Sequence, residues 1–409
     1  MWTPLPPEPT GIADYAFDLL SALADRAEIV AVVGDEAVSR VSSPPGVRVV
    51  GARAWLDDDS ATADVDVYQI GNNIIHGWIQ DRAVVSPGLV VYHDASLLDF
   101  YATRFFGKPG FAEEALWNEG LSLGFPPSPV TGQPRGLPTV RADGVHQPDR
   151  LAVLFSRRTV ETSLATIVHS EWLAGELRRR HPATPIHLVY HGAAIRDDPA
   201  TAIRARSELG WDTSHFVFGV FGGITGFKRV PTVLTAFAAL RQLHPLARLV
   251  VAGRADDSSV VDRVVGAVAA GGLEDDVQVL LDPPKERFDA VIGASDAVVN
   301  LRWPTTGETS GVMMRAFGAG RPVITSALPQ HRELPSSFCW QVPVDEVGEG
   351  RGLYEEMSAA VRDRERCRTA GLAARAFVEA SASWEAAADR YVEIAEEAVA
   401  KRGSRPVVS

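Results

Sequence analysis

The stretch FVFGVFGGITGFKRVPTVLTAFAALRQL, residues 216–243, runs from an apolar segment through a glycine-rich turn into an amphipathic segment. Its first six residues, Phe216–Phe221, are apolar throughout, as in a strand buried on both faces of a parallel sheet. Val230–Leu243 then carries apolar residues at helical spacing. A strand that leads into a helix is the repeating unit of doubly wound α/β domains, so this stretch predicts that fold class.

The same alternation continues on both sides. Further strands are expected at Ala27–Val33, Asp66–Ile70, Leu89–Tyr92, Thr166–Val168, His187–Tyr190, Ala247–Ala252, Val277–Leu281, Ala297–Leu301 and Pro322–Thr325. Further helices are expected at Ile12–Ala24, Glu171–Arg180, Val312–Ala319 and Trp384–Ala400. Because the alternation restarts after residue 200, we expect two Rossmann-like domains with parallel sheets, residues 1–198 and 199–382, and a terminal helical segment, residues 383–409.

Composition narrows the class of protein. A net charge of −12 disfavours a nucleic-acid-coating role, which needs a wide basic surface. Cys339 and Cys367 lack metal-ligand spacing and form no disulfide framework, so a reducing cytosol is expected. Neither a signal peptide nor an apolar run near the ~20 residues of a membrane span is visible. A lipid-linked acceptor would therefore bring the protein to the inner membrane face only peripherally.

Residues 103–150 interrupt the pattern. This stretch is rich in Gly and Pro and holds five aromatic residues, namely Phe105, Phe106, Phe111, Trp117 and Phe125. Long irregular segments inside compact domains are usually functional loops or disordered, and the aromatic residues argue against disorder. Two interpretations stay open, an acceptor-side lid and a structural insertion.

The glycine-rich turn after the strand suits a phosphate. Gly222 and Gly223 let the backbone approach a ligand closely, and a following helix would offer free N–H groups. Lys228 and Arg229 add two positive charges at the same place, so the turn fits a diphosphate. The spacing is neither that of a Walker loop nor that of a dinucleotide-binding loop. A glycine turn with two solvated basic residues is the alternative.

A second polar stretch, Pro304–Val312, follows the expected strand Ala297–Leu301. Ligands of open α/β sheets bind at this end of the strands. Thr309, Ser310 and Gly311 would present N–H groups at the start of a helix, and Glu308 could accept hydrogen bonds from sugar hydroxyls. Helix capping by Thr309 or Ser310 is the alternative and can coexist with ligand binding.

Weaker signals come from the first half. His93-Asp94 ends a strand and could contact a sugar, with Asp94 orienting the imidazole or meeting an acceptor. A Pro-rich turn delivers Gly11 to a helix start. Asn72 and Asn73 could recognise hydroxyl groups, although they also suit plain turns. Most of these motifs follow strands, so they should meet in a cleft between the domains.

Taken together, these motifs resemble those of the retaining GT-B glycosyltransferases of family four. The resemblance covers nearly the whole chain and rests on Pro7, Thr10–Tyr15, Gly71–His76, His93-Asp94, Val168–Trp172, His191-Gly192, Gly222-Gly223, Lys228-Arg229, Val251–Gly253, Gly307–Gly311, Ala319–Ile324 and Ser383–Glu385. It implies a GT-B fold, two domains facing across a cleft. It also implies transfer of a hexose-type sugar from a nucleoside diphosphate to a hydroxyl-bearing acceptor, in glycan or glycoconjugate biosynthesis.

The resemblance also implies roles for individual residues. The expected catalytic residues are His93, Asp94, Lys228, Arg229 and Glu308. The expected donor-binding residues are Gly11, Gly222, Gly223, Lys228, Arg229, Gly253, Arg254, Glu308, Thr309, Ser310, Gly311, Val312 and Arg315. The expected acceptor-binding residues are Asp14, Tyr15, Asn72, Asn73 and His76. No cofactor or metal is expected, because Lys228 and Arg229 would neutralise the departing diphosphate.

One departure from the family pattern concerns the nucleotide. The family usually has a second glutamate at the position of Ala316, or of Arg315 if the loop is one residue shorter, and this glutamate commonly holds the ribose. Arg315 cannot accept hydrogen bonds from ribose hydroxyls, so it would pair with Glu308 or reach a phosphate. A nucleotide-sugar 2-epimerase, a sugar phosphorylase and a non-catalytic nucleotide-sugar-binding protein stay open as alternatives.

Overall fold

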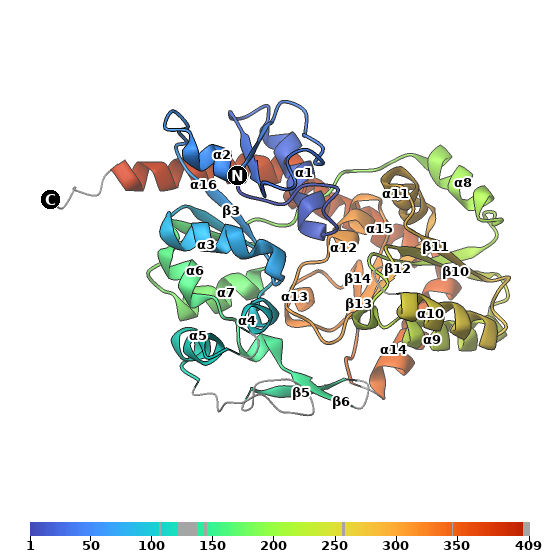
Figure 1. Cartoon of the computed structure of the whole chain (residues 1–409). Helices are drawn as coiled ribbons and strands as arrows, with labels where there is room; N and C mark the ends of the chain where they lie inside the picture. The colour runs from blue at the N-terminus through green and yellow to red at the C-terminus, as the bar shows by residue number, and fades with distance from the viewer. Residues whose placement is uncertain (106–107, 122–136, 143–144, 256–257, 346, 404–409) are drawn as a thin grey trace.

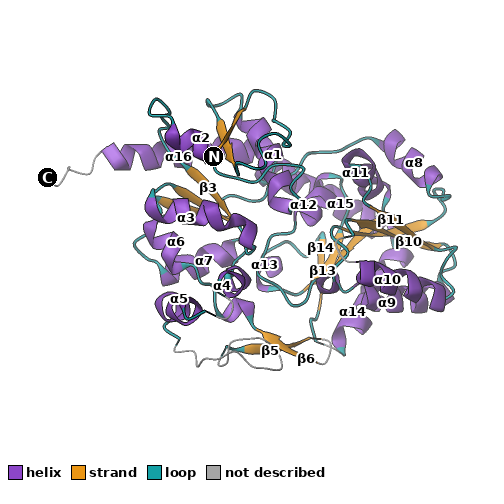
Figure 2. Cartoon of the chain, in the orientation of Figure 1, coloured by secondary structure: helices purple, strands orange, loops and turns teal. Residues whose placement is uncertain are grey.

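The computed structural model describes residues 1–105, 108–121, 137–142, 145–255, 258–345 and 347–403. Within these ranges the chain forms two α/β halves that lie side by side, the first at left and the second at right in Figure 1. Helices flank the strands in both halves, as the colours of Figure 2 show. The predicted α/β class with parallel sheets is confirmed.

The second half contains a parallel six-stranded sheet in the order β11-β10-β9-β12-β13-β14. Its strands are β9 (Phe216–Phe221), β10 (Ala247–Gly253), β11 (Val277–Leu281), β12 (Ala297–Asn300), β13 (Val323–Ser326) and β14 (Cys339–Val342). In the register, Phe218 of β9 lies opposite Leu249 of β10 on one side and Ala297 of β12 on the other. The sequence order turns round between β9 and β12, which is where open α/β sheets bind ligands.

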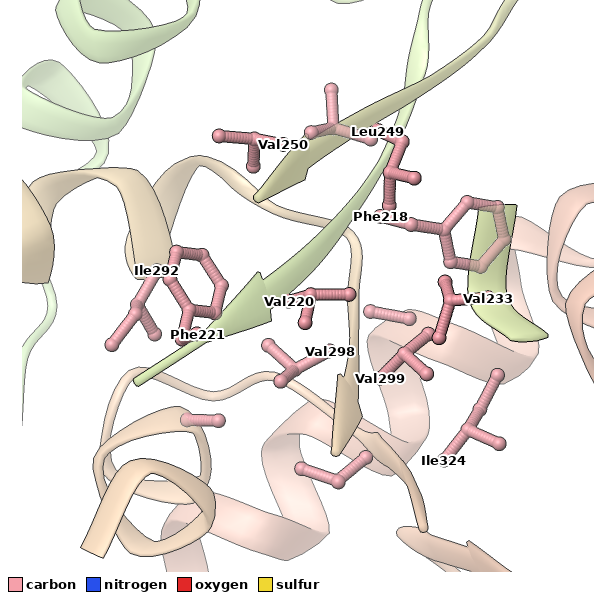
Figure 3. Packing of buried hydrophobic residues seen from close by; sticks show 14 of the residues in the cluster. Phe218, Val220, Phe221, Val233, Leu249, Val250, Ile292, Val298, Val299 and Ile324 are labelled. Atoms are coloured by element: carbon pink, nitrogen blue, oxygen red, sulfur yellow. The ribbon is translucent and has the colours of Figure 1, made fainter. Parts of the chain in front are cut away.

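Both faces of this sheet are covered by apolar side chains. Figure 3 shows Phe218 near Val233 of α9 (Val230–Leu243), and Phe221 near Ile292 of α11 (Lys285–Ala294). Because side chains alternate along a strand, Phe218 and Phe221 face opposite layers. Every residue of β9 is buried, which explains the uninterrupted apolar run in the sequence.

The sheet of the first half is also parallel, with the order β3-β4-β7-β8. Its strands are β3 (Val67–Ile70), β4 (Leu89–Tyr92), β7 (Ala165–Val168) and β8 (Ile186–Leu188). A separate parallel pair, β1 (Val30–Val33) and β2 (Arg48–Gly51), lies beside it. Trp2 bridges Val32 of β1 and Tyr68 of β3, so a single residue joins the two groups of strands.

The remaining elements of the first half are α1 (Gly11–Leu23), α2 (Ala52–Asp57), the 3₁₀ turn Ile74–His76, α3 (Gly77–Val85), α4 (Leu98–Arg104), α5 (Gly110–Glu119), the hairpin β5 (Thr139–Ala142) and β6 (Val145–Pro148), the 3₁₀ turn Arg150–Ala152, α6 (Arg157–Thr162) and α7 (Glu171–Arg180). Those of the second half are α8 (Pro199–Glu208), the 3₁₀ turn Gly226–Lys228, α10 (Ser258–Ala270), α12 (Gly311–Gly318), α13 (Pro329–Arg332), α14 (Gly348–Arg362) and α15 (Arg364–Ser381). Of the described helices, none is both long and apolar enough to cross a membrane.

The last helix, α16 (Trp384–Gly403), returns to the first half and lies beside α1 (Figure 1). The Tyr391 hydroxyl is hydrogen-bonded to the Tyr15 hydroxyl at 2.8 Å, and both side chains are buried. The chain crosses between the halves at two places that touch, because the Ala193 N–H donates to the Ala382 carbonyl at 2.8 Å. Any relative motion of the halves must therefore bend both crossings together.

The stretch 103–150 is more regular than the sequence suggested. It contains α5, which ends at Gly120 in the left-handed conformation, and the β5–β6 hairpin. Phe111 is buried with its ring 5.7 Å from that of Phe155. The hairpin reaches the second half, since Trp303 Nε1 donates to the Arg141 carbonyl at 2.9 Å. Phe106 and Phe125 lie outside the described residues, and the lid role stays a prediction.

Candidate active site

A cavity of ≈ 720 Å³ lies between the two halves and is lined by residues from both. Its walls are loops at the carboxyl ends of β3, β4, β9, β10, β11 and β12, together with the first turns of α1 and α12. The structure places nearly every sequence-predicted site residue on these walls: Gly11, Asp14, Tyr15, Asn72, Asn73, His76, His93, Asp94, Gly222, Gly223, Lys228, Gly253, Arg254, Glu308, Thr309, Ser310, Gly311, Val312 and Arg315.

Arg229 is the exception, because it does not belong to the described residues that line the cavity. Its Nε and Nη2 atoms each lie 2.9 Å from Oε2 of Glu349 on α14, a carboxylate that is almost fully buried. The backbone of Arg229 is left-handed, with φ 54°, between the short 3₁₀ turn and α9. The expected placement of Arg229 in the cavity is therefore wrong, since the buried ion pair directs its guanidinium elsewhere.

Lys228 does face the cavity, although the protein buries most of its side chain. Its ammonium donates to Asn300 Oδ1 at 3.0 Å, and the same oxygen accepts a hydrogen bond from the Ser310 hydroxyl at 3.3 Å. Burial, followed by the charge of Arg302, holds the pKa of Lys228 well below its usual range, while Glu308 opposes this. An anion in the cavity would stabilise the charged ammonium.

The carboxylate of Glu308 is occupied by the protein itself. Its Oε2 atom accepts hydrogen bonds from the Thr305 hydroxyl at 2.8 Å, the Thr306 N–H at 2.9 Å and the Thr306 hydroxyl at 2.7 Å. Its Oε1 atom is paired with Nη1 of Arg302. Burial alone would raise the pKa of Glu308, but Arg302 and these hydrogen bonds lower it to about 2.

The first turn of α12 completes the donor side. Ser310 is its N-cap, and the Ser310 hydroxyl accepts a hydrogen bond from the Met313 N–H at 3.3 Å. This confirms the capping interpretation of Ser310. Next to this turn, a Cβ atom on Gly311 would lie 3.0 Å from His191 Nε2. A Cβ on Gly253 would lie 1.8 Å from the Gly222 carbonyl, so the backbones of these two loops touch and residue 253 must be glycine.

On the side of the first half, His93 and Asp94 take separate partners. His93 Nε2 donates to Gln69 Oε1 at 2.6 Å, so Gln69 and not Asp94 orients the imidazole. Asp94 accepts a hydrogen bond from the Asn72 N–H at 2.8 Å, and its Oδ1 atom lies 2.7 Å from the Thr306 hydroxyl. Burial and the nearby charge of Glu308 raise the pKa of Asp94 to about 6.

The two asparagines have structural partners as well. Asn72 Nδ2 donates to Asp99 Oδ2 at 2.9 Å, and Asn72 Oδ1 accepts from the Phe100 N–H at 2.9 Å. Asn73 caps the 3₁₀ turn by accepting from the Ile75 N–H at 3.1 Å. Both still border the cavity, so turn formation and acceptor contact remain compatible.

Arg315 lines the cavity but does not pair with Glu308, and its contact with a phosphate stays a prediction. Its Nη1 atom lies 3.2 Å from Asp289 on α11, and its Nη2 atom lies 3.8 Å from Asp18 on α1. Since Asp18 and Asp289 come from different halves, the guanidinium is held between them and not by Glu308. Asp289 also pairs with Arg196 at 2.6 Å, in the segment that joins the halves.

Several residues that line the cavity had no site role in the prediction from sequence, namely Asp18, Asp99, His191, Asp282, Lys285, Phe288, Arg302, Thr306 and Trp384. Arg302 follows β12 by two residues. A basic residue directly after a buried strand of a parallel sheet was a signal that could have identified it. Asp18 carried no such signal, because a single acidic residue on an amphipathic helix is usually solvated.

The fold is that of solved GT-B glycosyltransferases. Sucrose-phosphate synthase from Thermosynechococcus elongatus matches with a TM-score of 0.68 at 17% identity, over 96% of this chain and 94% of that chain. The Anabaena protein Alr3699/HepE, solved in complex with UDP and glucose, matches with a TM-score of 0.65 at 16% identity, over 97% and 98% of the two chains. At these identities the likeness concerns the fold, so the predicted GT-B architecture is confirmed.

Sequence comparison adds similarities over part of the chain. Residues 202–342 match the family model described as Glycosyl transferases group 1. D-inositol 3-phosphate glycosyltransferase of Segniliparus rotundus is 29% identical over 231 residues, which cover 54% of this chain and 50% of that protein. The match thus spans about half the length of this curated relative. The segment 202–342 is thus similar to glycosyl transferases group 1, in line with the resemblance.

Proposed function

We propose that the protein is a retaining, metal-independent glycosyltransferase that moves a hexose-type sugar from a nucleoside diphosphate to a hydroxyl-bearing acceptor. The observation that carries this proposal is the arrangement of Lys228, Glu308 and the first turn of α12 around one interdomain cavity. A buried ammonium beside the N–H groups at a helix start suits the phosphates of a nucleotide sugar. The group 1 match and the GT-B fold support the same reading.

The proposed reaction is a front-face substitution. The bond between the anomeric carbon and the phosphate oxygen breaks, and its electron pair leaves with the diphosphate. The acceptor oxygen forms the new bond on the same face of the sugar, and its proton passes to the departing phosphate oxygen. Lys228 and the N–H groups at the start of α12 stabilise the negative charge that develops on the phosphate. No metal or organic cofactor takes part in this scheme.

The two sides of the cavity would divide the work. The second half, with Gly222, Gly223 and Gly311, would hold the donor diphosphate. In the first half, His93 is a neutral hydrogen-bonding group, because burial and the neighbouring His169, His191 and His76 hold its pKa well below the usual range. His93 would contact the transferred sugar, and Asp94, Asn72 and Asn73 would face the acceptor.

The test is a donor panel with EDTA present throughout. UDP-, GDP- and ADP-glucose are incubated with the protein and mixed hydroxyl acceptors, and the anomeric configuration of the product is read by proton NMR. We expect a retained product from the wild type and at least a ~100-fold lower rate from Lys228→Met, since oxyanion-stabilising groups contribute on this scale. Arg368→Gln, at an exposed position on α15, is the matched control.

Three results would contradict the proposal. Product of inverted configuration would overturn retention, and loss of turnover with EDTA would overturn metal independence. Interconversion of donor sugars without any acceptor would favour the epimerase alternative. Near-normal turnover in a folded Lys228→Met variant would remove the central role of this side chain.

A further inference from the structure

If the cavity holds a diphosphate, a second positively charged side chain is needed there beside Lys228, because Arg229 is paired with Glu349. Two phosphates carry more negative charge than a single ammonium neutralises. Arg302 lies on the same wall, at the carboxyl end of β12, and β12 is the sheet neighbour of the strand that leads to Lys228. The two cations therefore come from adjacent strand ends at the turning point of the sheet.

The backbone and side chain of Arg302 are both fixed. Its N–H donates to the Ser326 hydroxyl at 2.9 Å, and its Nη1 atom is paired with Glu308. Its Nε atom is buried and has no hydrogen-bond partner among the described residues. A buried guanidinium donor left without an acceptor is costly, so this side chain still has one donor that needs an acceptor.

The hydrogen bonds around Glu308 explain why this carboxylate is better placed to hold Arg302 than to bind a sugar. Three protein donors already reach Oε2, and Arg302 reaches Oε1. Each oxygen of an ionised carboxylate offers about two acceptor positions, so one position on Oε1 is left. The main consequence of this network is a guanidinium held at a defined place beside the Lys228 ammonium.

We infer that Arg302 is the second cation of the diphosphate site, taking the place that the sequence assigned to Arg229, with Glu308 as its positioning residue. This inference rests on the proposed function. The planar guanidinium has donors in a fork that matches phosphate oxygens, whereas Lys228 acts as a point charge. Together they bracket the diphosphate from two strand ends, opposite the N–H groups of α12.

The experiment measures dissociation constants for UDP, GDP and ADP by titration calorimetry, with EDTA and at constant ionic strength. Two isosteric double variants are compared, Arg302→Gln with Glu308→Gln, and Arg229→Gln with Glu349→Gln. Each removes a whole ion pair, so neither leaves one buried partner charged and alone. Circular dichroism and thermal unfolding establish that each variant is folded, and Arg368→Gln is again the exposed control.

We expect the first double variant to weaken binding of the preferred nucleoside diphosphate about 10- to 100-fold, the scale of one charge-assisted interaction. The second double variant should stay within about threefold of the wild type. The single variant Glu308→Gln keeps a side-chain oxygen that can hold Arg302 in place but removes one negative charge near the diphosphate, so it should bind at least as tightly as the wild type. The affinity should therefore change in opposite directions in this single variant and in the Arg302 double variant. A general loss of structure would weaken binding in both.

The outcomes are distinct. If the wild type binds a nucleoside diphosphate and the Arg302 double variant binds it equally well, the inference is overturned while the proposed function stands. If the Arg229 double variant alone loses binding, the original sequence assignment is right and the inference is again overturned. If the wild type binds none of the three nucleotides, the proposed function itself fails.

Discussion

The ammonium of Lys285 on α11 donates to the carboxylate of Asp18 on α1 at 2.8 Å, which ties the two halves together beside the cavity. Arg315 lies 3.8 Å from the same carboxylate. Both side chains of the pair are partly exposed, so each ion pair should contribute no more than about 1 kcal/mol to the free energy of unfolding. We expect these ion pairs to affect the spacing of the two halves more than the free energy of unfolding.

We therefore expect Asp18→Asn to increase the radius of gyration in solution without ligand, measured by small-angle X-ray scattering. The loss in unfolding free energy should stay below about 1 kcal/mol. Asp389→Asn is the matched control, because Asp389 pairs with Arg26 within the first half and crosses no boundary. An unchanged radius for Asp18→Asn would show that other contacts alone set the spacing.

A larger stability effect is expected at Arg229. This guanidinium and Glu349 are nearly buried, with side chains 10% and 2% exposed. Arg229→Met removes the partner of a buried carboxylate, which should cost about 3–5 kcal/mol in the free energy of unfolding. Arg229→Met with Glu349→Leu should recover most of that loss. Denaturant unfolding measures both.

The control for the Arg229–Glu349 pair lies on α14, the helix that carries Glu349. Arg351 and Glu355 are 4.0 Å apart and mostly exposed, so Arg351→Gln should change stability by less than about 0.5 kcal/mol. If Arg229→Met were as mild as Arg351→Gln, the buried pair with Glu349 would not be what holds Arg229 away from the cavity.

The Thr306 hydroxyl lies 2.7 Å from both Asp94 Oδ1 and Glu308 Oε2, but it has one hydrogen to donate. A proton on Asp94 resolves this conflict, because Asp94 can then donate to Thr306 while Thr306 donates to Glu308. The raised pKa of Asp94, about 6, means that the folded state binds this proton more strongly than the unfolded state. The contribution of Asp94 to stability is therefore present below its unfolded pKa and is lost as the pH rises through about 6.

Asp94→Asn imitates the protonated form. Its amide can donate to Thr306 while its oxygen accepts from the Asn72 N–H. We expect the stability of this variant relative to the wild type to rise between pH 4 and 6 and to level off above that, in thermal unfolding at constant ionic strength. Asp25→Asn, at an exposed position of the first half, is the control. A difference between Asp94→Asn and the wild type that does not change with pH would refute the shared-proton arrangement.

The sequence predicted those elements best whose periodicity is local and uninterrupted. The predicted bounds of Val230–Leu243 and Val277–Leu281 are those of the structure. Trp2 was missed because one bridging residue has no periodicity of its own. The same holds for β2, a short strand whose first residue is exposed and whose next two are only partly buried.

The candidate site was predictable to the extent that strand ends share one edge of a parallel sheet. The direction of each side chain was not predictable in the same way. Lys228 and Arg229 are neighbours in sequence, yet Arg229 is directed by Glu349, far along the chain. Glu308 looked like a sugar ligand until its pairing with Arg302 and its threonine donors were visible. The direction of such side chains depends on tertiary contacts that a local sequence pattern does not contain.

A last prediction concerns His169, which is buried in a group of rings that includes Tyr15, His93 and His191. Its Nδ1–H donates to the Val189 carbonyl at 2.7 Å, and its Nε2 atom has no partner among the described residues. Burial lowers the pKa of His169 to about 4, against a weaker raising effect of this hydrogen bond. The unfolded chain therefore takes up the proton first as the pH falls, so the neutral imidazole stabilises the fold above about pH 6.5 and this contribution is lost toward pH 4.

We expect His169→Asn, whose amide can replace the Nδ1 donor, to lower stability at pH 7 but to show a shallower loss of stability between pH 6.5 and 4 than the wild type. Thermal unfolding across this range measures the slope, with His146→Asn, at an exposed position of the β5–β6 hairpin, as the control. A slope equal to that of the wild type would mean that His169 is not a group whose burial makes the protein sensitive to acid.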